Sequence, residues 1–168
     1  MSADAIKTVD FTPAYGADIV VSCEKAKDPK NGSIYLKPTQ IVLGIGCRRN
    51  TAFENIDRAI RQSLLKLQID ISDIDMIASI DVKKDEPGIK EFCERNRIEF
   101  VTYTADELMA VQGEFSASQF VREHVGVDNV CERAAVLACS RECNEAGELI
   151  YKKHKYDRVT VAAARYPY

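Results

Sequence analysis

The spacing of apolar residues changes in a regular order along the chain. Residues 40–45, QIVLGI, form a continuous apolar run, which is typical of a strand buried on both faces of a sheet. Apolar residues then recur at spacings of three and four, which predicts one buried face on a helix of about four turns: Phe53, Ile56, Ile60, Leu64 and Leu67. Residues 75–81 and 98–103 predict two more strands, each followed by a helical pattern.

Polar residues predict where several helices begin. The capping-box pattern, in which Ser or Thr precedes Glu or Gln by three residues, occurs at Thr51 with Glu54, at Thr104 with Glu107 and at Ser116 with Gln119. Gly126 is expected to end the helix that starts at Ser116. Asp85 is expected to cap a further helix, because Pro87 suits the first helical turn.

The last third of the chain changes from a helical to a strand pattern. Asn129 and Glu132 predict the start of an alanine-rich helix that ends before Gly147. Residues 148–152 and 158–165 then predict two strands, and the short segment KHKYDR between their cores predicts a hairpin.

These elements predict a three-layer α/β/α fold. We expect a mixed, mainly parallel sheet of about five strands, with helices on both faces and a late strand antiparallel. Residues 17–22 and 33–38 read as two short strands before Pro38, and the pattern changes there. Residues 1–38 are therefore expected to be a small hairpin or the tail of a preceding region, and residues 39–168 the α/β domain.

Composition narrows the classes of partner. The net charge of −3 argues against a general nucleic-acid or membrane-surface binder, since such proteins have a basic excess. No apolar stretch approaches the roughly 18 residues of a membrane span. The first ten residues lack the features of a secretion signal, so the cytoplasm is the expected compartment.

Cysteine and histidine spacing does not predict a metal centre. The six cysteines include no CxxC pair and are expected to be reduced, mostly packed thiols. Cys139 and Cys143 can share one helix face, but a single helix seldom supplies the tetrahedral set that zinc needs. His124 and His154 are isolated and are expected to be structural or solvated.

The loops that follow the parallel strands are the predicted binding site. Ligands of open α/β sheets bind beyond the carboxyl ends of the strands. Residues 44–50, 82–88 and 103–107 should therefore converge at one edge of the sheet.

The first of these loops, GIGCRRN, allows several interpretations. Gly44 and Gly46 are not followed by the third glycine of a dinucleotide motif or by the Lys-Ser/Thr of a phosphate loop, so nucleotide binding is disfavoured. A glycine turn with Arg48 and Arg49 can hold an anion. Cys47, near a helix start and two arginines, could be a reactive thiol, although no histidine lies nearby in sequence. A plain strand-to-helix turn with solvated arginines stays open.

The second loop adds charges of both signs. Lys83 and Lys84 can bind anionic groups, and Asp85 adjoins them as the expected cap. Glu86 is the better candidate for general acid–base chemistry, because a capping residue has its oxygens occupied. Glu132 either supports its own helix start or points into the same crevice.

A family resemblance adds what spacing does not show. The strings IVLGIGCRRNT, KKDEPGI, ADEL, FVREHVGVDNVCERAAVLAC and YDRVTVAAAR occur in this order. Together they resemble the C-terminal domain family of the cobalamin (vitamin B12) biosynthesis proteins CbiG and CobE, over about residues 40–166. Residues 17–38 resemble the end of the central CbiG region, which precedes that domain.

The resemblance implies a reaction and a substrate. It implies opening of the lactone ring of cobalt-precorrin-5A with release of acetaldehyde to give cobalt-precorrin-5B. The substrate is a tetrapyrrole ringed by carboxylates, which suits the glycines, Cys47, the two arginines, the two lysines and Asp85 as binding positions. Glu86 is the first candidate for activating water and Glu132 the second. Cobalt arrives within the substrate, so no cofactor is expected.

The resemblance also leaves an alternative. The domain can instead bind or hand on a corrinoid intermediate without chemistry, as a CobE-like carrier. If the lactone chemistry lies at the junction with the N-terminal CbiG region, we expect the isolated piece to be inactive. That region and other pathway enzymes are the expected protein partners.

Overall fold

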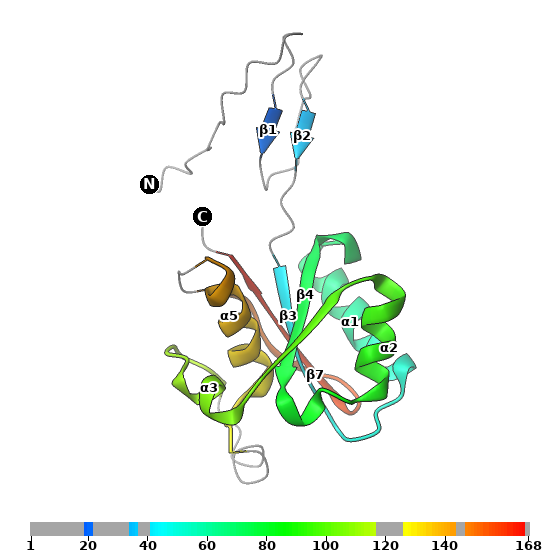
Figure 1. Cartoon of the computed structure of the whole chain (residues 1–168). Helices are drawn as coiled ribbons and strands as arrows, with labels where there is room; N and C mark the ends of the chain where they lie inside the picture. Colours follow the sequence, from blue (N-terminus) through cyan, green and yellow to red (C-terminus); the bar gives the residue numbers. More distant parts are fainter. Residues whose placement is uncertain (1–18, 22–33, 37–40, 117–125, 144–146, 167–168) are drawn as a thin grey trace. The chain divides into compact units, whose positions relative to one another are not determined.

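The computed structural model describes residues 19–21, 34–36, 41–116, 126–143 and 147–166, and Figure 1 shows their elements. The chain divides into two compact units, residues 1–39 with Tyr168 and residues 40–167. In the first unit, β1 (Ile19–Val21) pairs with β2 (Ile34–Leu36) in parallel. A hairpin requires antiparallel pairing, so that alternative is wrong. The assignment of residues 1–38 to the tail of a preceding region stays a prediction.

The second unit is built on a five-stranded sheet in the order β5-β4-β3-β7-β6. Its strands are β3 (Ile41–Cys47), β4 (Ile74–Ile80), β5 (Glu99–Tyr103), β6 (Glu148–Lys155) and β7 (Val159–Arg165). The first three are parallel, whereas β7 runs antiparallel to both β3 and β6. The predicted mixed sheet with a late antiparallel strand and a terminal hairpin is confirmed.

Helices cover both faces of this sheet (Figure 1). Helices α1 (Phe53–Leu67) and α2 (Pro87–Asn96) pack on one face, while α3 (Ala105–Ala110) and α5 (Val130–Cys143) pack on the other. Two short 3-10 turns, η1 (Ile71–Asp73) and η2 (Asp81–Lys83), flank β4. The α/β/α layering is therefore confirmed. Within the described residues, no helix is long and apolar enough to cross a membrane.

The alternation of β3 between two cores explains its continuous apolar run. Val42 belongs to the cluster beneath α5, whereas Leu43 and Ile45 belong to the cluster beneath α1 and α2, and all three are fully buried. The predicted stripe on α1 is also confirmed, since Ile56 and Ile60 are fully buried in the second cluster.

Two predicted helix starts are confirmed by side-chain hydrogen bonds. Thr104 and Glu107 form the reciprocal capping box of α3: the Glu107 N–H donates to Thr104 Oγ1 at 3.3 Å and the Thr104 N–H donates to Glu107 Oε2 at 2.7 Å. At α5, the Glu132 N–H donates to Asn129 Oδ1 at 3.0 Å. The helix predicted after Ser116 falls on residues 117–125, outside the described residues.

Two other predicted caps are wrong by one residue. Helix α1 has Ala52, not Thr51, at its N-cap, with no side-chain bond. Helix α2 has Glu86, not Asp85, at its N-cap, again without a side-chain bond. Pro87 is the reason for the second shift, because the residue before a proline is biased to the extended backbone that an N-cap needs.

Candidate functional site

The loops after β3 and β4 meet, as predicted, and Glu86 joins them. The Thr51 N–H donates to Glu86 Oε1 at 2.9 Å, and Lys83 Nζ donates to Glu86 Oε2 at 3.1 Å. The end of β5 lies at the same edge, since Tyr103 pairs with Ile80, but the Thr104 and Glu107 side chains bind each other and Glu107 also pairs with Arg141. The candidate site is therefore built from the ends of β3 and β4.

Glu86 and Lys83 form a buried ion pair at this edge. Their side chains are 4% and 13% exposed. Both carboxylate oxygens of Glu86 accept a hydrogen bond, so Glu86 connects Thr51, just before α1, to Lys83. To take a proton from water, Glu86 would have to release one of these donors. Its catalytic assignment stays a prediction.

Asp85 and Lys84 lie on the surface beside this pair. The Asp85 side chain is 76% exposed and lies 3.7 Å from Lys90 Nζ. Lys84 is exposed and ends the turn η2. Asp85 and Lys84 can both reach a ligand from solvent. The exposed ion pair between Asp85 and Lys90 contributes little to stability.

The predicted glycine turn is wrong, because Gly44 and Gly46 lie inside β3. The turn is made by residues 48–50, and Asn50 takes the left-handed backbone at φ +55°. A Cβ at Gly44 would lie 1.7 Å from the carbonyl oxygen of Cys131 in α5. Gly44 therefore lets the α5 backbone approach the strand, a packing role that its motif does not reveal.

Cys47 is half-buried between the charges of the site. Burial raises the pKa of its thiol to about 11, although the nearby Lys83 ammonium lowers it. Glu86 raises the pKa further, while Thr51 and Arg158 lower it. A thiol with a raised pKa is mostly protonated at neutral pH, which disfavours the reactive-thiol interpretation of Cys47.

Arg48 and Arg49 have a fixed backbone and exposed side chains. The Arg48 N–H donates to the Arg158 carbonyl at 2.9 Å, and Thr51 Oγ1 donates to the Arg48 carbonyl at 2.6 Å. Neither guanidinium has an ion pair or hydrogen bond among the described residues. The two side chains are therefore available to bind an anion from solvent.

Sequence reasoning missed a third arginine at this place. Arg158 precedes β7, and β7 pairs with β3 so that Val159 lies opposite Cys47. Arg158 Nη2 lies 3.4 Å from the Arg49 carbonyl. The string YDRVTVAAAR held the residue, but only the strand order shows that it reaches the loop after β3.

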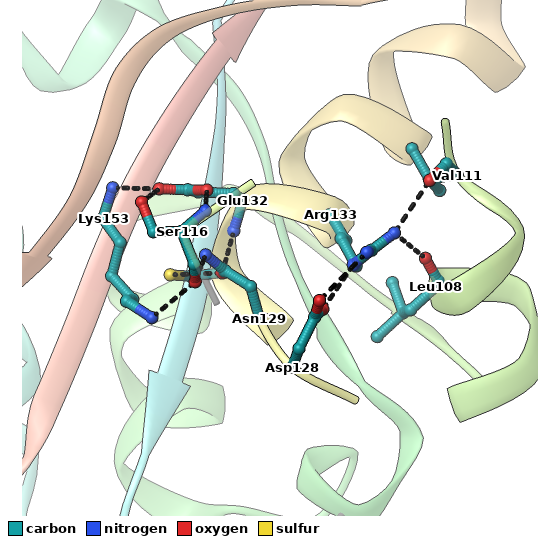
Figure 2. Close-up of polar contacts among 9 residues, drawn as sticks. Leu108, Val111, Ser116, Asp128, Asn129, Glu132, Arg133 and Lys153 are labelled. Carbon is teal, nitrogen blue, oxygen red and sulfur yellow. Dashed lines mark hydrogen bonds and ion pairs between the residues drawn. The ribbon is translucent and has the colours of Figure 1, made fainter. Parts of the chain in front are cut away.

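Glu132 has its own set of partners, shown in Figure 2. It is fully buried, and its carboxylate accepts from the Ser116 N–H and Oγ, each at 2.8 Å, and from the Lys153 N–H at 2.6 Å. Lys153 Nζ and Asn129 Nδ2 both donate to the Ser116 carbonyl. Glu132 thus ties Ser116 and β6 to the start of α5. No contact joins it to Glu86 within the described residues, and its catalytic assignment also stays a prediction.

Arg133 forms a second buried network beside it (Figure 2). Its guanidinium donates to Asp128 Oδ1 at 2.8 Å and to the Val111 and Leu108 carbonyls at 2.7 and 3.3 Å. The hydrogen bond from Arg133 holds the pKa of Asp128 below its usual range. These contacts join the end of α3 to α5 and are structural.

The described residues contain no group of three or more His, Cys, Asp or Glu that could hold a metal ion. His154 stacks on Tyr151 with ring centroids 4.1 Å apart, and its Nδ1 lies 2.8 Å from the Lys152 carbonyl. His124 lies outside the described residues.

Comparison with known proteins adds independent information. Residues 41–164 match the family described as "Cobalamin synthesis G C-terminus". The cobalt-precorrin-5A hydrolase of Priestia megaterium is 32% identical over 139 residues, which cover 83% of this chain and 35% of that protein. The enzyme of the same name from Salmonella typhimurium is 37% identical over 102 residues, covering 61% and 29%. The chain thus spans about a third of the length of these curated relatives.

A solved structure has the same fold. The crystal structure of CobE, a protein from the cobalamin (vitamin B12) biosynthetic pathway, aligns with a TM-score of 0.72 and 26% identity. The alignment covers 76% of this chain and 91% of that one.

Proposed function

The chain belongs to the cobalamin synthesis G C-terminus family, and from this premise we propose that it binds cobalt-precorrin-5A and takes part in opening its lactone ring. The relatives named cobalt-precorrin-5A hydrolase support the choice of substrate. Because the chain spans about a third of their length, we propose that turnover also needs the N-terminal region of such a hydrolase.

The observation that best supports this proposal is the pair of exposed arginines at the edge of β3. Arg48 and Arg49 have no anionic partner among the described residues, and the turn between β3 and α1 holds their backbone. A cobalt-precorrin carries acetate and propionate side chains around its ring. Guanidinium groups bind carboxylates by two parallel hydrogen bonds, which favours this substrate class. The cobalt is part of the substrate, so the reaction as proposed needs no further cofactor.

Lactone opening requires attack of water on an ester carbonyl, and a carboxylate is the natural base for it. We propose Glu86 first, because it lies beside Cys47 and Thr51 at the same edge as the arginines. Glu132 is the second candidate.

A carrier function without chemistry is the second candidate function. It is favoured by the fact that Glu86 and Glu132 both have their oxygens occupied by protein donors. Such a site has exposed arginines that can bind a ligand, whereas both candidate bases already accept hydrogen bonds from the protein.

The test is to mix the isolated chain with cobalt-precorrin-5A, alone and together with the N-terminal region of a related hydrolase. Acetaldehyde release in either mixture supports the hydrolase function. Tight binding without acetaldehyde in both supports the carrier function, and absence of binding refutes both. Arg48→Ala should weaken binding by more than tenfold, because a charge-assisted contact contributes about 1.5–3 kcal/mol. If turnover in the mixture survives Glu86→Gln, Glu86 is neither acid nor base.

A further inference from the structure

Arg158 is placed at the candidate site by the β6–β7 hairpin. The Tyr156 N–H donates to the Val159 carbonyl at 2.7 Å and closes the turn. The Arg158 carbonyl accepts from the Arg48 N–H at 2.9 Å. These bonds hold the backbones of Arg48 and Arg158 side by side, although the residues are far apart in the sequence.

The turn itself does not need an arginine. Arg158 takes the left-handed backbone at φ +61°, which glycine adopts without strain and a long side chain does not. Its guanidinium makes one long contact, 3.4 Å from Nη2 to the Arg49 carbonyl. Asp157, its neighbour, instead accepts from Asn55 Nδ2 at 3.3 Å.

The backbones of three arginines therefore lie close together at this edge. Arg48, Arg49 and Arg158 are all exposed, and none has an ion pair with a described residue. Three such side chains, extending from neighbouring backbone positions, can bind the separate carboxylates of one multivalent anion.

An exposed apolar side chain lies on the same edge. Val82 is 62% exposed in the turn η2 that directly follows β4. Strands β4 and β7 are separated by β3, so their ends are about 10 Å apart at the usual strand spacing. One macrocycle can span this distance.

We propose that Arg158 completes a carboxylate-binding site with Arg48 and Arg49, and that the same tetrapyrrole packs its apolar face on Val82. This inference rests on the proposed function and deepens it, because it places the carboxylates of the ligand at the three arginines and its ring at Val82. Arg158 is a binding residue in this arrangement.

The test compares two corrinoids that differ in charge: dicyanocobyrinic acid, whose side chains end in free carboxylates, and dicyanocobinamide, whose side chains are amidated. Arg158→Gly removes the guanidinium and suits the left-handed backbone, so the variant should fold. Arg97→Gly is the matched control, because Arg97 is an exposed arginine with φ +57° at the far end of α2. Binding is measured by titration calorimetry on the full chain.

We expect Arg158→Gly to weaken binding of the acid by about tenfold and to leave the amide unchanged, since one charge-assisted contact is lost. Arg97→Gly should change neither. Val82→Ser should weaken the binding of both corrinoids by the same factor, about threefold, because an apolar contact is lost.

Equal binding of the acid by Arg158→Gly and wild type, with Arg48→Ala still impaired, would overturn this inference and leave the proposed function standing. Equal weakening of acid and amide by Arg158→Gly would also overturn it, and so would an unchanged affinity of Val82→Ser for both corrinoids. A wild-type chain that binds neither the acid nor cobalt-precorrin-5A would overturn both proposals.

Discussion

Gly44 offers the sharpest test of how this fold is packed. The residue lies in the middle of β3, beneath the start of α5. A methyl group at position 44 would lie 1.7 Å from the Cys131 carbonyl oxygen and 3.0 Å from the Ala135 nitrogen. Non-bonded heavy atoms prefer about 3.5 Å, so Gly44→Ala requires the strand and the helix to separate by roughly 2 Å.

The energetic cost follows from what resists that separation. Both obstacles are helix backbone, and the surrounding Val42, Ala134 and Ala135 are fully buried. Extra methylenes in a packed core cost about 1–3 kcal/mol, and more when the neighbours cannot move. We therefore expect Gly44→Ala to lower the free energy of unfolding by about 3 kcal/mol or more, a large part of the roughly 5–15 kcal/mol of a typical domain.

Gly46 in the same strand is the matched control. A methyl group there would meet only the side chain of Thr160, with Oγ1 at 2.7 Å. Rotation of Thr160 would break its 3.2 Å bond to the Gly46 carbonyl, worth about 0.5–1.5 kcal/mol, while alanine restricts the unfolded chain and offsets part of that. Gly46→Ala should thus lie within about 1 kcal/mol of wild type.

Urea unfolding followed by circular dichroism measures both variants against the wild type. The midpoint for Gly44→Ala should fall well below the other two at a similar slope. Equal midpoints for all three proteins would refute the packing argument. If Gly44→Ala stayed stable but lost corrinoid binding, the glycine would serve the ligand and not the helix.

Two further predictions concern charge. Glu86→Gln should lower the pKa of Cys47 from about 11, because the carboxylate that raises it is gone while Lys83 stays; the pH profile of Cys47 alkylation measures this, and an unmoved profile contradicts it. Asp128→Asn should destabilise the fold at pH 7 by about 1–2 kcal/mol, since a part-buried charged hydrogen bond to Arg133 is weakened. Arg133 depresses the folded-state pKa of Asp128, so this stability is present above the unfolded value near 3.9 and is lost as the pH falls through the folded value. Unfolding curves of both proteins should therefore converge below about pH 4, and a constant difference down to pH 2 would contradict the assignment.

Local interactions made much of the fold predictable. The Thr104–Glu107 box and the Asn129 cap each join residues three apart, and the stripe on α1 repeats with the helix period. Patterns of this range are complete within a few residues, so they show in the sequence. The sequence alone thus predicted the element order and the mixed sheet, which the structure confirms, and the meeting of the loops after β3 and β4.

The identity and state of the site residues depended on contacts between distant segments. The Thr51 N–H binds Glu86, 35 residues away, so the Glu86 side chain serves the loop after β3 and not its own helix. Gly44 lies against the backbone of α5, and burial raises the pKa of Cys47 more than Lys83 and Arg158 lower it. Arg158 joins Arg48 and Arg49 only because β7 lies against β3. Sequence periodicity specifies which face of an element is buried, whereas the neighbours of that face follow from strand order and packing, which only the tertiary structure decided.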